Sequence, residues 1–138
     1  MAKTTVAAVK AEGNFYKEQF ACATEEELDA LLQERIDEAA AEIRWQVGAE
    51  NYESTDEDVA AMITTAETYL ACAKAYQTIA NIVATWDLEE LPSEFIHPEA
   101  IPGIIERYRR LAEELLKRFD TRADEIVRPY FRARSIDE

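Results

Sequence analysis

The fold class is decided by residues 24–47, which read TEEELDALLQERIDEAAAEIRWQV. Thr24 followed three residues later by Glu27 is a capping box, in which each side chain accepts a hydrogen bond from the backbone of the other. Apolar residues then recur at spacings of three and four, which predicts one buried helical stripe. The stripe comprises Leu28, Leu32, Ile36, Ala39, Ala40, Ile43 and Val47. Gly48 is a helix stop signal, so we predict a helix over 25–47.

Two further stretches show the same helical periodicity. An Ala-rich, mostly apolar segment predicts a helix over 55–86, capped by Ser54 or Thr55 and flanked by neighbours on several sides. A third helix is predicted over 104–127 and ends before Pro129, because proline lacks an amide donor. Its expected core seam is Ile104, Tyr108, Leu111, Leu115 and Phe119, and Ile105, Ala112 and Leu116 widen it. With only 3 Gly and 4 Pro in 138 residues, an all-β fold is excluded, and we predict an all-α bundle of three long helices.

The remaining segments define the domain organisation. Residues 1–23 have no clear periodicity and are predicted to form an N-terminal arm. Residues 24–127 are predicted as the helical bundle domain, interrupted by a proline-rich connector at 87–103. Residues 128–138 are predicted to form an extended C-terminal tail.

The charge balance restricts the partners of this chain. It carries 29 acidic and 15 basic residues, a net charge of −14. Direct binding to nucleic acid or to an anionic membrane needs clustered Lys and Arg, so we expect this chain to bind neither by itself. The two cysteines form no disulfide framework, and we expect a cytosolic chain without a leader or a membrane span.

Catalytic patterns are weak. The single histidine, His97, lies between prolines in the connector, and Glu94 to His97 is one isolated copy of a Glu-x-x-His pattern that di-iron bundles need twice. Acidic residues on helix 25–47 suggest a less favoured alternative, a Mg²⁺-dependent all-α nucleotide pyrophosphohydrolase, but the second helix supplies only Glu67 in its interior. We therefore assign no catalytic, cofactor-binding or metal-binding residue and do not expect an enzyme.

The C-terminal tail is the strongest candidate for partner binding. Arg and aromatic residues are enriched at protein interfaces, and this segment contains both, with no acid before Asp137. The predicted partner-binding residues are Arg128, Tyr130, Phe131, Arg132 and Arg134. A basic tail on an acidic body is suited to docking on another copy or on a different protein. An acidic helical binding protein, an inhibitor or chaperone for a basic partner, is the alternative.

The capped helix 24–47, followed by a polar gap and by AAMITTAETYLACAKAYQTIANIV at 60–83, resembles the head–tail connector proteins of tailed bacteriophages, also called adaptor or head-completion proteins. The resemblance covers residues 24–138. It implies a ring of copies, typically twelve, that is docked on the portal protein through the C-terminal tail and followed by a tail or stopper protein. It further implies a virion protein, made in the host cytoplasm, through whose bore DNA passes without specific binding. An acidic bore is consistent with that role, since it repels phosphates.

Overall fold

The computed structural model describes residues 2–85 and 98–119, and within these ranges all regular structure is helical. The predicted all-α class is therefore confirmed. The predicted count of three helices is not confirmed, because the described residues form five α-helices, three of them long and two short. They are α1 (Val6–Gly13), α2 (Glu25–Val47), α3 (Ala49–Tyr52), α4 (Glu57–Val83) and α5 (Ile101–Leu116).

Helix α2 has the bounds that its sequence predicts. The Thr24 hydroxyl accepts a 3.2 Å hydrogen bond from the amide of Glu27, and the Glu27 carboxylate accepts one from the amide of Ala23 at 2.9 Å. The return bond of the capping box thus goes to the residue before the cap. Gly48 ends the helix with a φ of 88°, a conformation that favours glycine. Its buried residues are Leu28, Leu32, Ile36, Ala39, Ile43 and Val47.

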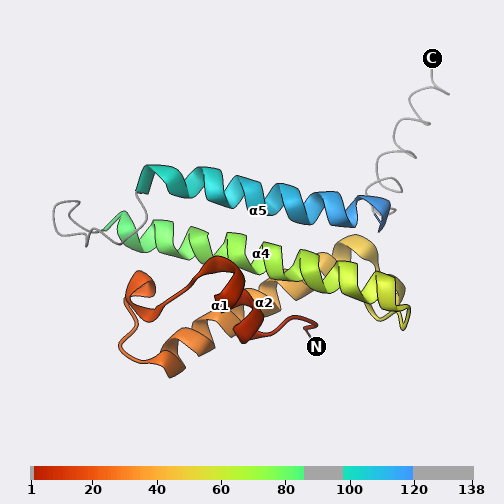
Figure 1. The fold of residues 1–138 in the computed structure, drawn as a ribbon, viewed down its shortest axis with the longest axis horizontal. Coiled ribbons are helices and arrows are strands. Elements are labelled where there is room, and N and C mark those ends of the chain that lie inside the picture. The colour runs from red at the N-terminus through yellow and green to blue at the C-terminus, as the bar shows by residue number, and fades with distance from the viewer. Residues whose placement is uncertain (1, 86–97, 120–138) are drawn as a thin grey trace, which may run out of the picture.

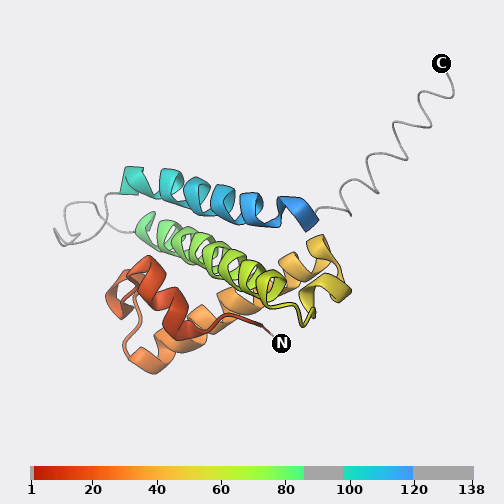
Figure 2. The same ribbon diagram turned by 45° about the vertical axis from the view of Figure 1, so that its right-hand side comes forward.

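Helix α4 is the central layer of the fold. In Figures 1 and 2 it lies between α5 on one side and α1 with α2 on the other. The alanines among its buried residues, such as Ala71 and Ala75, let these neighbours approach closely. Its cap is Asp56 rather than the predicted Ser54 or Thr55: the Asp56 carboxylate accepts from the amides of Asp58 and Val59 at 2.9 and 3.1 Å. The described helix ends at Val83, three residues before the predicted end.

Helix α5 begins earlier than predicted. It starts at Ile101 after a 3₁₀ turn at Pro98–Ala100, because Pro102 is tolerated in a first turn whose amides have no helical acceptor. A 3₁₀ turn at Lys117–Phe119 follows it, and residues 120–127 of the predicted helix lie outside the described residues. Within the predicted seam, Ile104, Ile105, Leu111 and Leu115 are only partly buried. The residues that the core encloses are Ile101, Tyr108, Ala112, Leu116 and Phe119.

The prediction that residues 1–23 form an arm is wrong for residues 2–23. This segment folds back onto the bundle, and Val9, Phe15 and Phe20 are buried. The Phe15 ring centroid lies 5.5 Å from that of Phe20 and 4.9 Å from that of Tyr76 on α4. These apolar residues come from α1, from a turn and from a 3₁₀ turn at Lys17–Phe20, so they follow no single periodicity in the sequence.

Candidate interaction surfaces and the buried carboxylate

The predicted partner-binding residues lie outside the described residues. Arg128, Tyr130, Phe131, Arg132 and Arg134 all belong to 120–138, so the structure neither brings them together nor separates them. Glu94 and His97 of the connector also lie outside the described ranges. The candidate surfaces below therefore come from the helices.

The outward side of α2 is a row of carboxylates that ends in an indole. Glu27, Glu34, Glu38 and Trp45 follow one another at spacings of seven, four and seven residues, which places them on one side of a helix. All four are exposed, and Trp45 retains 59% of its accessible surface. We call these four residues the α2 ridge. It presents negative charge and one large apolar side chain on the side opposite the core.

Basic side chains neutralise the edges of α2. Lys10 of α1 lies 2.5 Å from an Asp29 oxygen and 3.1 Å from a Glu25 oxygen. Hydrogen bonds to Asp29, and then to Glu25, raise the pKa of the Lys10 ammonium. On the other edge, Lys74 of α4 lies 2.7 Å from Glu42. These pairs join α2 to its neighbouring helices.

Arg35, which lies beside the α2 ridge, partly neutralises the negative charge of its carboxylates. Arg35 lies 3.2 Å from Glu34 and 3.3 Å from Glu38, and it donates to the Thr78 hydroxyl of α4. A single guanidinium therefore serves two carboxylates. The ridge remains net negative.

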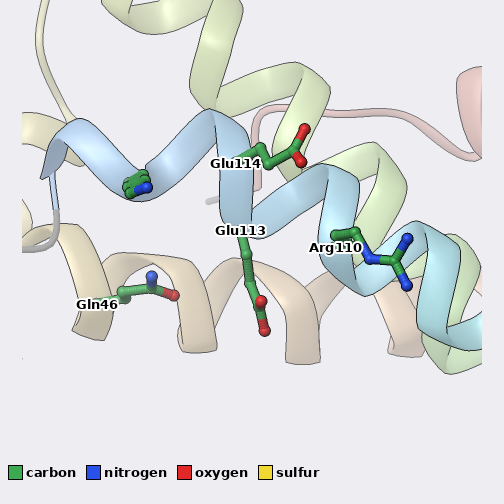
Figure 3. Close-up of a pocket in the computed structure, with 5 residues that line it drawn as sticks. Gln46, Arg110, Glu113 and Glu114 are labelled. Atoms are coloured by element: carbon green, nitrogen blue, oxygen red, sulfur yellow. The ribbon is translucent and has the colours of Figure 1, made fainter.

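A hollow of about 450 Å³ lies between α2 and α5. It is lined by Gln46 of α2 and by four residues of α5: Arg110, Glu113, Glu114 and Lys117. Figure 3 shows Glu113 extending toward α2, while Glu114 points to the other side of α5. Arg109 reaches across to Glu42 at 4.0 Å. Because both acidic and basic side chains line this hollow, its charge favours neither an anionic nor a cationic ligand.

The most distinctive polar group is one that the sequence analysis did not identify as a site. Glu67 of α4 is completely buried, and its carboxylate accepts hydrogen bonds from the amides of Lys3 and Thr4, at 2.7 and 2.6 Å, and from the Tyr52 hydroxyl at 2.5 Å. Burial, followed by the hydrogen bond to Glu67, raises the pKa of Tyr52. The feature of the sequence that could have identified Glu67 is its place as a single acid on the core side of an otherwise apolar helix. Because its partners are core donors, this carboxylate joins the N-terminus, α3 and α4.

The thiols are placed for packing rather than for nucleophilic chemistry. Cys72 is fully buried on α4, and burial raises its pKa to about 12. Burial also raises the pKa of Cys22. A thiol acts as a nucleophile only when ionised, so both cysteines are poor nucleophiles near neutral pH.

A Mg²⁺ site of the kind discussed for hydrolases would need converging acidic side chains. Residues 2–85 and 98–119 contain no group of three or more His, Cys, Asp or Glu side chains that could hold a metal ion. Glu67, the acid in the interior of α4, is engaged by the three donors described above.

Comparisons with protein-family models, with curated proteins and with solved structures gave no significant match. Across the part of the chain that the structure describes, every helix is too short or too polar to cross a membrane.

Proposed function

We propose that this protein is a structural subunit of a phage head–tail connector, which assembles as a ring on the portal protein at the head–tail junction of the virion. The observation that carries the proposal is the pair formed by α2 and α4. Two long helices of 23 and 27 residues, capped by Thr24 and Asp56 and separated by the short helix α3 and a turn, occupy the stretches on which the resemblance to this family rests.

The charge distribution supports the same role. Residues 1–103 have a net charge of −15, whereas residues 104–138 have a net charge of +1. In a ring, the α2 ridge would give a bore lined by carboxylates, which repels DNA phosphates and lets a duplex pass without adhering. The basic and aromatic tail would then be left for docking on the portal protein.

Truncation of the tail tests the docking step. Ending the chain after Val127 removes the three arginines and two aromatic residues of the tail, and we expect it to abolish co-purification with the portal protein while the helical circular dichroism spectrum is unchanged. A variant that ends after Ser135 retains all five predicted docking residues and is the matched control. Native mass spectrometry of the complex should show a closed ring for the control. Portal binding by the chain that ends after Val127 would contradict the proposal.

The acidic α2 ridge also favours a second candidate, a monomeric binding protein for a basic partner. The two functions differ in mass and in salt dependence. An acidic binder remains monomeric with its partner and is released by salt, since exposed charge pairs are screened. A connector subunit instead increases in oligomeric state when the portal protein is added.

A further inference from the structure

Residues 2–4, which lie ahead of α1, are attached to α4 through the side chain of Glu67. We call this segment the N-terminal strap. Oε2 of Glu67 accepts the amides of Lys3 and Thr4, at 2.7 and 2.6 Å, and Oε1 accepts the Tyr52 hydroxyl. All three of these partners are donors. The ionised carboxylate suits them, because in that state it only accepts hydrogen bonds.

A protonated Glu67 cannot keep these three hydrogen bonds as they are. With the proton on Oε2, the new O–H group meets the two amide hydrogens of the strap. With the proton on Oε1, the Tyr52 oxygen has to accept it, and the strap amides are left with a neutral and therefore weaker acceptor. Because Glu67 is fully buried, water does not replace a lost partner. Neutralising this side chain therefore weakens the attachment of the strap.

The charged and titratable groups that surround Glu67 come from the strap, from α2 and from α3. The Lys3 ammonium lies 5.2 Å from the centre of the Tyr52 ring, and Arg44 of α2 pairs with Glu53 at 3.0 Å. Burial raises the pKa of Tyr52, and the charge of Arg44 offsets this only in part. Lysine and arginine keep their charge in acid, and the tyrosine keeps its proton. Glu53 is exposed and contacts Arg44, so the acid response of the strap belongs to Glu67.

The strap also has an anchor that does not ionise. The Thr68 hydroxyl donates to the carbonyl of Thr64 at 2.9 Å, so the Thr4 hydroxyl is the donor in its 2.6 Å contact with Thr68. Hydroxyl groups do not titrate in acid, so this contact is indifferent to pH. Helix α1 is attached separately, through the buried Val9. Loss of the Glu67 bonds therefore loosens the strap ahead of α1.

We propose that Glu67 is a proton-controlled latch: its ionised carboxylate holds residues 2–4 on α4, and its protonation releases them while α2, α4 and α5 remain folded. These three helices are joined by their own apolar contacts across the core. Release exposes the side chains that the strap contacts, which are Glu67, Tyr52 and Thr68. The latch is a property of the single subunit, so it depends on neither of the two proposed functions.

Amide hydrogen exchange, measured by NMR on the full chain, tests the latch. Glu67→Gln keeps the shape of the side chain but replaces the carboxylate by a neutral group that carries donors, as protonation does. At pH 7 it should lower the protection factors of the Lys3 and Thr4 amides by about tenfold, the effect of one lost hydrogen bond. Protection of Ala75, in the core of α4, should be unchanged. The matched control is Glu114→Gln, on an exposed acid of α5, which should alter none of these amides.

An acid titration of the parent protein tests the same latch without a substitution. After correction for the intrinsic pH dependence of exchange, protection of Lys3 and Thr4 should fall at a higher pH than protection of Ala75. The midpoint should coincide with that of the Glu67 carboxyl carbon signal. Tyr52→Phe removes a donor to the ionised form and should move this step to higher pH.

Two results would overturn the inference. One is a Glu67→Gln variant that folds and protects Lys3 and Thr4 as well as the parent protein does. The other is a parent protein in which these two amides lose protection together with Ala75 as the pH falls. If Glu67→Gln does not fold, the titration of the parent protein decides by itself.

Discussion

The Tyr52 hydroxyl donates a 2.5 Å hydrogen bond to Oε1 of Glu67, while Oε2 of the same carboxylate accepts the amides of Lys3 and Thr4. A buried acceptor that loses one donor retains most of its desolvation cost. We therefore expect Tyr52→Phe to lower the free energy of unfolding by about 1–3 kcal/mol. Urea unfolding followed by circular dichroism measures the change. Tyr69→Phe, on a partly buried tyrosine of the same core, is the control, and an equal loss in the two variants would contradict the role of the Glu67 bond.

Alkaline pH should destabilise the protein through Cys72. Its pKa is raised from 9.0 to about 12 in the folded state, so the unfolded chain releases this proton at lower pH than the folded chain. The stability contributed by the neutral buried thiol is complete below pH 9, decreases above it, and is fully lost only above about pH 12. Near pH 10 the loss from this group should be about 1.4 kcal/mol, the value of one pKa unit.

The variant Cys72→Ala isolates that contribution. Its absolute stability is lower because a buried side chain is shortened, but its free energy of unfolding should fall less steeply than that of the parent protein between pH 8 and pH 10.5. Denaturant titrations at several pH values in a reducing buffer give the two slopes. Identical slopes would show that the thiol does not resist ionisation in the fold.

The orientation of α5 predicts which of its leucines contributes most to the stability of the fold. Leu116 is 2% exposed, whereas Leu111 and Leu115 are only partly buried. Leu116→Ala should cost about 2–5 kcal/mol, as expected for a fully enclosed leucine, and the other two alanine variants should cost less. Thermal unfolding of the three variants tests this order. A larger loss for Leu115→Ala than for Leu116→Ala would contradict this orientation of α5.

Two glycines should respond in opposite directions to alanine. A Cβ on Gly13 would lie 2.2 Å from the nearest atom of the Phe15 ring, whereas a Cβ on Gly103 meets nothing within 4 Å. Gly13→Ala displaces a buried ring and should destabilise by about 1–3 kcal/mol. Gly103→Ala, within α5, should stabilise by about 0.5–1 kcal/mol. Melting temperatures that moved in the same direction would contradict this packing.

Local signals in the sequence were sufficient for the all-α class and for α2, because a cap, a single apolar stripe and a stop glycine agree within 24–48. They were not sufficient for the N-terminal segment. Its burial depends on partners more than sixty residues away, such as Tyr76, whose hydroxyl donates to the carbonyl of Gly13. Periodicity carries no information about such pairs.

The predicted seam of α5 included Tyr108 and Ala112, which are buried, but also Leu111 and Leu115, which are only partly buried. More apolar residues lie on that helix than the core encloses, so contact with α4 decides which of them are fully buried. Glu67 illustrates the same limit from the polar side. Its position in α4 was evident, but its donors come from residues 3, 4 and 52, which only the tertiary fold brings to it.

At Lys3 and Thr4 the carboxylate of Glu67 accepts hydrogen bonds from backbone amides, which every amino acid except proline possesses. These bonds therefore depend on the position of the main chain and not on the two side chains. Most replacements at position 3 therefore preserve this anchor, but proline, which has no amide hydrogen, removes it. This anchor consequently constrains the spacing of residues 3 and 4 from α1, whereas the identity of Thr4 is constrained by its hydroxyl, which lies 2.6 Å from that of Thr68.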